Sequence, residues 1–222
     1  MSAFLTLLRR ELSLAWGGGG GPLLALTFYA AVATLFPLAV GADMARLATV
    51  ATGLSWLALA LATLLSLERL FERDYEDGAL DMLAIGPAPL EVVALVKCLA
   101  QWLTNGLPLA IAAPIAAIAL GSPADLAPMI FATAAIGGLG LSFTGGAGAA
   151  LALGSRRGGV LIAVIVLPLF VFPVIFGAGA IEAYAENLEA WRSGFAFLAA
   201  YSLGAMAIGP FAMAAACRNA LS

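Results

Sequence analysis

The stretch 68-ERLFERDYEDGALDMLAIGPAPLEVVALVK-97 interrupts an otherwise apolar chain and divides it into two unequal parts. It carries seven of the 13 acidic residues and the only lysine, Lys97. In the whole chain, 63% of the residues are hydrophobic, only 10% are charged, and the mean hydropathy is +1.05. These values lie far outside those of soluble globular proteins. We therefore expect a single domain of 222 residues whose solvent is mostly lipid.

The middle of this stretch predicts a short amphipathic helix from Asp77 to Ile85. Asp77-Gly78 is typical of a helix start, and a carboxylate in the first turn interacts favourably with the helix dipole. Gly86-Pro87 then ends the helix. With its acidic approach the helix is either a docking site for a cytosolic partner or a solvated turn. The residues assigned to docking are Glu72, Asp74, Asp77, Gly78, Leu80, Asp81 and Leu83, with the leucines on one face.

Six apolar segments flank this stretch, the third overlapping its end, near residues 22–41, 47–67, 92–119, 127–153, 159–180 and 194–217. Each can cross about 30 Å of hydrocarbon at roughly 1.5 Å per residue. The third and fourth are longer than a span requires, so they tilt or bend. Pro108 and Pro114 can kink the third, and the glycines of 137–148 indicate close packing of the fourth. The predicted fold is an all-α polytopic membrane protein with six transmembrane helices.

Two shorter segments are expected to lie in the membrane interface. Residues 1–16 place apolar side chains at near-helical spacing and the charges of residues 9–11 on the remaining arc, which predicts an interfacial helix. Gly17–Gly21 is a break before the first span and is assigned no chemistry. Residues 181–193 predict either a small amphipathic helix at the outer interface or an ordinary loop with an interfacial tryptophan, Trp191.

The distribution of basic residues predicts the orientation. With the N-terminus inside, eight of the ten Lys and Arg residues are cytoplasmic and only Arg46 and Arg192 are outside. Both termini are then cytoplasmic. The order becomes spans one and two within 22–67, a cytoplasmic coupling region at 68–91, spans three to six within 92–217, and a cytoplasmic tail at 218–222.

Three polar residues stand on one face of the third span: Lys97, Gln101 and Asn105, at i, i+4 and i+8. Polar groups inside a membrane are costly and usually face the interior of a bundle or a wet cavity. Alternatively, Lys97 extends its ammonium to the membrane surface, and the two amides bond neighbouring helices.

The residue inventory argues against catalysis. The chain has no histidine, and its two cysteines, Cys98 and Cys217, lie in apolar surroundings where they suggest small core residues rather than a disulfide. The only lysine lies between Val96 and Cys98, so no Walker A motif is present. We assign no catalytic residue, no metal site and no stably bound cofactor. The net charge of −3 argues against a nucleic-acid partner.

Short motifs follow one another along nearly the whole chain. They include Leu35-Phe36-Pro37-Leu38, Leu67-Glu68-Arg69-Leu70-Phe71, Gly106-Leu107-Pro108-Leu109, Arg157-Gly158-Gly159-Val160-Leu161, Val166-Leu167-Pro168-Leu169 and Pro210-Phe211-Ala212. In this order the chain resembles the permease subunits of ABC-2 type exporters. Within that group it is similar to the haem exporter protein B family, the B subunit of the cytochrome c maturation system.

The resemblance implies a multi-pass permease of the bacterial inner membrane that pairs with a separate cytosolic ABC ATPase subunit. It also implies a haem-handling membrane protein and a haem chaperone as partners, and we expect a second copy of the chain. Haem is then either exported or handled, with ATP turnover releasing the loaded chaperone; the absence of histidine favours the second role. The alternatives are an ABC-2 permease for another amphiphile, such as a lipid or drug, and a non-transporting membrane scaffold for an ATPase.

Overall fold

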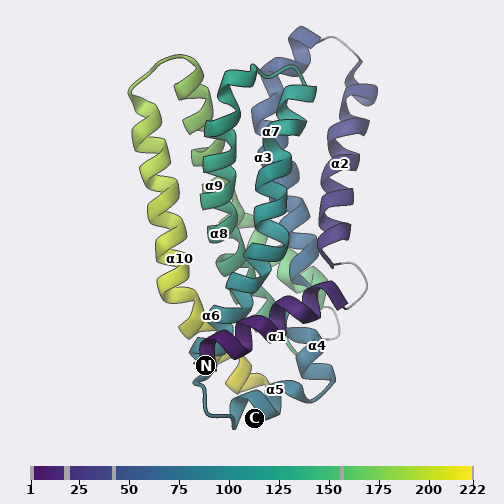
Figure 1. Ribbon diagram of the computed structural model, residues 1–222, viewed down its shortest axis with the longest axis vertical. Coiled ribbons are helices and arrows are strands. Elements are labelled where there is room, and N and C mark those ends of the chain that lie inside the picture. Colours follow the sequence, from purple (N-terminus) through teal and green to yellow (C-terminus); the bar gives the residue numbers. More distant parts are fainter. Residues whose placement is uncertain (1–2, 18–20, 42–43, 156–157, 222) are drawn as a thin grey trace.

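The computed structural model describes residues 3–17, 21–41, 44–155 and 158–221, and all regular secondary structure in these ranges is helical. Figure 1 shows an elongated bundle of long helices with shorter helices gathered at one end. Six of the described helical segments are long and apolar enough to cross a membrane. They are α2 (Gly21–Val40), α3 (Met44–Leu67), α6 (Leu90–Gln101) continued by η1 (Trp102–Gly106) and α7 (Leu107–Ala119), α8 (Ala127–Leu151), α9 (Gly158–Ala185) and α10 (Ala190–Ala220).

This architecture confirms the predicted all-α fold with six spans. The first residues of α1 (Ala3–Gly17) and the last of α10 lie at the same end of the bundle, as an even number of crossings requires (Figure 1). That end also holds α4 (Arg69–Glu76) and α5 (Ala79–Ala84), whereas the short turn η2 (Ala124–Leu126) precedes α8 at the other end. Helix α1 runs across the bundle rather than along it, as an interfacial helix would. Most of the glycine break, residues 18–20, lies outside the described ranges.

The fourth span, α8, is the packing centre of the bundle. Its glycines let neighbouring side chains approach the backbone closely: a Cβ at Gly137 would overlap the indole of Trp56, and one at Gly145 would overlap Leu67. The same indole lies against Gly177 of α9, so Trp56 is wedged between two helices. The close packing predicted for this span is therefore present.

The third span departs from a regular α-helix at η1, a π-helical turn. Pro108 has no backbone N–H, so the carbonyl of Thr104 lacks the donor that an α-helix would supply at that position. The indole Nε1 of Trp102 donates a hydrogen bond to the carbonyl of Ala135 on α8, at 2.9 Å. A Cβ at Gly106 would lie 2.7 Å from Cδ1 of Trp102, so glycine leaves room for the ring. The prolines predicted a distortion but not this turn.

The segment 181–193 contains no helix of its own. Helix α9 continues to Ala185, and α10 begins at Ala190. Asn187 adopts a left-handed conformation with φ +55°, which reverses the chain between them. The predicted separate amphipathic helix is therefore wrong, and the loop alternative holds only for residues 186–189, because Trp191 belongs to α10. Trp191 packs edge-on against Tyr184, with the ring centroids 5.6 Å apart.

Candidate functional site

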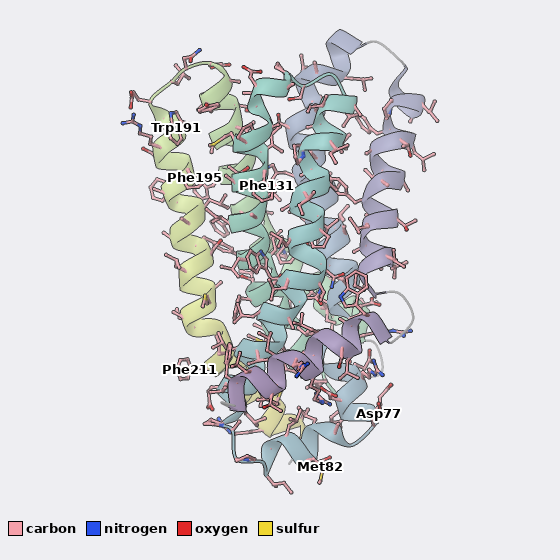
Figure 2. All side chains as sticks on the ribbon, in the orientation of Figure 1. Asp77, Met82, Phe131, Trp191, Phe195 and Phe211 are labelled. Atoms are coloured by element: carbon pink, nitrogen blue, oxygen red, sulfur yellow. The ribbon has the colours of Figure 1, made fainter. Side chains whose placement is uncertain are left out.

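The predicted coupling region folds as two short helices joined at a glycine. Helix α4 ends at Glu76, and Gly78 then adopts φ +71°, a conformation that side-chain-bearing residues rarely take. Helix α5 runs from Ala79 to Ala84 and ends before Gly86-Pro87, close to the predicted limits of Asp77 and Ile85. Figure 2 shows Asp77 and Met82 at the far end of the molecule, opposite Trp191.

The assigned docking residues divide into exposed and buried groups. Glu72, Asp77 and Asp81 are exposed, Gly78 and Leu83 are half-buried, and Asp74 and Leu80 are buried. Leu80 is 0% exposed because α5 turns this side chain into the core of the same chain. A partner can therefore contact neither Asp74 nor Leu80, and their assignment to direct docking is wrong.

The large apolar side chains left exposed on α5 and at its C-terminal cap are Met82 and Ile85, at 69% and 81%. They lie two and five positions after Leu80, so they occupy the opposite side of the helix. Sequence reasoning chose the face with the better leucine spacing. That choice overlooked a signal in the sequence. A six-residue helix with apolar residues on both sides must bury one side and expose the other.

Lys97 is the centre of a buried cluster of charges. Its ammonium forms ion pairs with a carboxylate oxygen of Asp74 and with Oε2 of Glu11, the latter at 3.1 Å. Arg10 donates a hydrogen bond to Oδ1 of Asp74 at 2.9 Å and pairs with Glu11. The cluster contains two positive and two negative side chains and thus has no net charge. These four residues, Arg10, Glu11, Asp74 and Lys97, are called the charge cluster below.

The charge cluster joins three elements that are distant in sequence. Arg10 and Glu11 come from α1, Asp74 from α4 and Lys97 from α6. The hydrogen bond to Asp74 raises the pKa of the Arg10 guanidinium above its ordinary value, although partial burial acts in the opposite direction. Lys97 is only 3% exposed, so its ammonium is held among side chains of α1 and α4 at this end of the bundle rather than in open solvent.

Helix α4 contributes two groups to the surroundings of Lys97 in addition to the carboxylate of Asp74. The ammonium donates to the carbonyl oxygen of Leu70 at 3.3 Å and lies 5.7 Å from the centroid of the Phe71 ring. A carboxylate, a carbonyl dipole and the face of an aromatic ring each stabilise a cation. Lys97 therefore fastens α4 to the beginning of the third span.

The polar face continues from Lys97 into the bundle. Asn105 Nδ2 donates to Gln101 Oε1 at 3.1 Å, and Gln101 Nε2 donates to Ser66 Oγ of α3 at 2.6 Å. All three residues of the predicted face are buried. Within the described part of the chain, Asn105 Oδ1 has no hydrogen-bond partner. Gln101 thus connects the third span to α3, whereas the bonds of Asn105 stay within its own span.

The cysteines lie beside this face. Cys98 and Cys217 are free and buried, which confirms them as small core residues, and Cys98 Sγ is 3.4 Å from the sulfur of Met213. Among the described residues, no group of three or more His, Cys, Asp and Glu side chains is placed to hold a metal ion. What the site offers is an exposed apolar surface on α5 and a charged connection from there to the third span.

Comparisons with known proteins identify relatives over the full length. The family model described as "CcmB protein" matches residues 2–220. "Heme exporter protein B" of Paracoccus denitrificans is 45% identical over 212 residues, covering 96% of this chain and 97% of the relative. The protein of the same description from Bradyrhizobium diazoefficiens is 41% identical over 221 residues, covering 100% of both chains. That from Escherichia coli K12 is 39% identical over 216 residues, covering 97% of both.

Proposed function

This chain belongs to the CcmB protein family, and on that premise we propose that it is the membrane permease subunit of an ATP-driven complex in cytochrome c biogenesis. A separate ABC ATPase supplies the hydrolysis. The chain is a multi-pass membrane protein, and its place is the bacterial inner membrane with both termini in the cytoplasm. We expect two copies in the complex.

The observation that carries this proposal is the exposed apolar surface of α5. Helix α5 lies at the end of the bundle that holds α1 and α4 (Figure 1), outside the six spans, and Met82 and Ile85 are exposed there. That end also carries Arg9, Arg69 and Arg73, which supports a cytoplasmic position. Apolar side chains so exposed to water are typical of a protein interface. The ATPase docks there, and Glu72, Asp77 and Asp81 attract a basic rim of that partner.

The relatives are described as heme exporter proteins, which is the reason for assigning haem to this complex. A cavity lined by Trp56, Ala113 and Ile130 between the spans has a volume of about 10 Å³, which is room for one water molecule. Haem is far larger than this cavity. A larger open hollow of about 360 Å³ lies at the ends of the last three spans, where Asp125, Tyr184 and Trp191 are among its lining residues, and the chain has no histidine to ligate the iron of haem. These facts favour a role in which ATP turnover releases a haem-loaded chaperone from a haem-handling membrane protein, rather than passage of haem through one chain.

Affinity purification of the tagged permease in mild detergent tests the proposal. We expect an ATP-hydrolysing subunit in stoichiometric amounts, together with a haem-handling membrane protein. A strain lacking the permease should retain apocytochromes c and accumulate haem on the chaperone. Normal holocytochrome c levels in that strain would refute the proposal and favour export of another amphiphile. Normal levels with an ATPase subunit that binds but cannot hydrolyse ATP would instead favour a scaffold.

A further inference from the structure

The third span consists of two parts that are held differently. Its first part, α6, carries Lys97 and is tied through the charge cluster to α1 and α4. Its second part, α7, follows the π-helical turn η1 and packs along α8. Helix α5, the proposed docking helix, follows α4 directly and also contacts α6. Helices α1, α4, α5 and α6 are therefore connected on one side of η1, and α6 also contacts α10, where Arg218 pairs with Glu91 at 2.6 Å.

We propose that Lys97 is a positioning residue that makes α1, α4, α5 and α6 move as one body, so that a displacement of α5 by the ATPase reaches the π-helical turn. The proposal rests on the docking role given to α5 above. Its physical basis is that one ammonium binds groups from two other helices: Glu11 of α1, and the carboxylate of Asp74 with the carbonyl of Leu70 on α4. No other charged group in the charge cluster belongs to the third span.

Burial makes this connection stiff. Lys97 and Asp74 are almost inaccessible to water, so water cannot replace either partner as it does in a surface ion pair. The remaining direct bond between α1 and α4, from Arg10 to Asp74, involves a guanidinium that is one-third exposed. Without Lys97, α4 and α1 would keep that bond to each other, α1 would keep its packing against α6, and both would lose their common polar attachment to α6.

The π-helical turn is where the group ends. The regular hydrogen-bond pattern is interrupted there, because the turn is π-helical and Pro108 supplies no donor to it. Bending of a helix concentrates at such positions. Trp102 in this turn is bonded to the carbonyl of Ala135, so a movement of α6 pulls on α8, the packing centre of the bundle. The path from the docking surface to the spans thus runs α5, α4, Lys97, α6, Trp102 and α8.

The test requires a variant that removes the connection without leaving an unpaired charge. Lys97→Met alone would leave the charge cluster with an excess negative charge, which is strongly destabilising when buried. The double variant Lys97→Met/Asp74→Asn removes one charge of each sign and leaves the pair Arg10–Glu11. A matched control, Arg10→Gln/Glu11→Gln, also removes one of each sign but leaves Lys97 paired with Asp74.

Hydrogen exchange of the purified permease in nanodiscs gives the first measurement. In Lys97→Met/Asp74→Asn the amides of α1, α4 and α5 should exchange about tenfold faster or more, with those of α8 and α10 unchanged. In the control, faster exchange should be confined to α1. Unchanged exchange in the first variant, or equal loosening of α4 in both, would overturn the proposal. This measurement needs no ATPase, so it decides the connection even if the proposed function fails.

Coupling in cells gives the second measurement, which a purely structural role would not change. Holocytochrome c formed per ATPase co-purified with the permease should fall about tenfold in Lys97→Met/Asp74→Asn and less than about twofold in the control. Lys97→Arg, which keeps the charge, should recover most of the wild-type ratio. A wild-type ratio in the double variant would overturn the proposal. If that variant does not accumulate, Lys97→Gln/Asp74→Asn, which also removes one charge of each sign but keeps a polar side chain at position 97, takes its place, and a wild-type ratio in it would overturn the proposal equally.

Discussion

Truncation of the two large exposed apolar residues on α5 and at its C-terminal cap, Met82→Ala/Ile85→Ala, should release the ATPase while leaving the permease folded. The two side chains are 69% and 81% exposed, so most of their apolar surface is free to be buried by a partner. Burial of a large apolar side chain contributes roughly 1.5–3 kcal/mol. Since alanine keeps a part of this, the double variant should lose about 2–4 kcal/mol of binding, which is a roughly 30- to 1,000-fold weaker Kd.

The matched control is Leu80→Ala on the buried side of the same helix. This side chain is fully buried, so its truncation should cost the permease itself about 2–5 kcal/mol of stability. Its abundance in the membrane should fall, while the ATPase recovered per surviving permease stays near the wild-type value. Asp81→Asn removes one exposed charge and should weaken docking by only about 0–1 kcal/mol.

Titration of the purified ATPase onto permease in nanodiscs, followed by light scattering or a fluorescent label, measures these differences. Membrane abundance of each variant separates loss of binding from loss of protein. The reasoning is refuted if Met82→Ala/Ile85→Ala binds the ATPase as tightly as the wild type. It is also refuted if Leu80→Ala weakens binding per mole of folded permease more than the exposed pair does, because α5 would then present the other face.

Three further predictions address topology and packing. Reporter fusions at Asp77 should be cytoplasmic and those at Asn187 periplasmic, and a cytoplasmic signal at Asn187 would contradict the six-span topology. Gly78→Ala should cost about 1–2 kcal/mol of stability in a thermal unfolding assay, because φ is +71° at this position. The cost comes from the backbone alone, since no atom lies within 4 Å of the added Cβ. Gly78→Asn should cost less in the same assay, because asparagine tolerates this conformation. Gly137→Leu should abolish accumulation of the protein, since the new side chain overlaps Trp56, and normal accumulation in an immunoblot would show that the wedge can relax.

The spans could be predicted from sequence because lipid imposes a length and an apolar composition on every crossing. The predicted limits of the first four spans agree with the helices to within a few residues, and the fifth and sixth are longer than predicted. The turn at Asn187 and the π-helical turn at Trp102–Gly106 were not predictable in this way. Both depend on single backbone conformations and on contacts with other helices, such as the bond from Trp102 to α8, which hydropathy does not register.

The ion-pair partners of Lys97 could not be predicted from local sequence patterns either, for a related reason. Asp74 is 23 positions away and Glu11 is 86 positions away, so helical periodicity relates neither to the lysine. The general rule that a charge at a membrane span needs a partner was sufficient to expect a carboxylate near Lys97. It could not select Asp74 from the seven acidic residues of the stretch 68–97, because that choice depends on how α4 turns after the second span.

Because Asp74 is buried, its substitution should have a larger effect than the one expected for an exposed carboxylate. Treated as one of several exposed charges, Asp74→Asn would weaken docking by only about 0–1 kcal/mol. In the structure this carboxylate is buried between Lys97 and Arg10, so the substitution leaves excess positive charge in the charge cluster. Removal of one partner of a buried ion pair costs about 3–5 kcal/mol. Asp74→Asn should therefore reduce membrane abundance more than Glu72→Gln or Asp77→Asn, whose carboxylates are exposed. Equal abundance of the three variants in an immunoblot would contradict the buried pairing, and with it the connection from α4 to the third span.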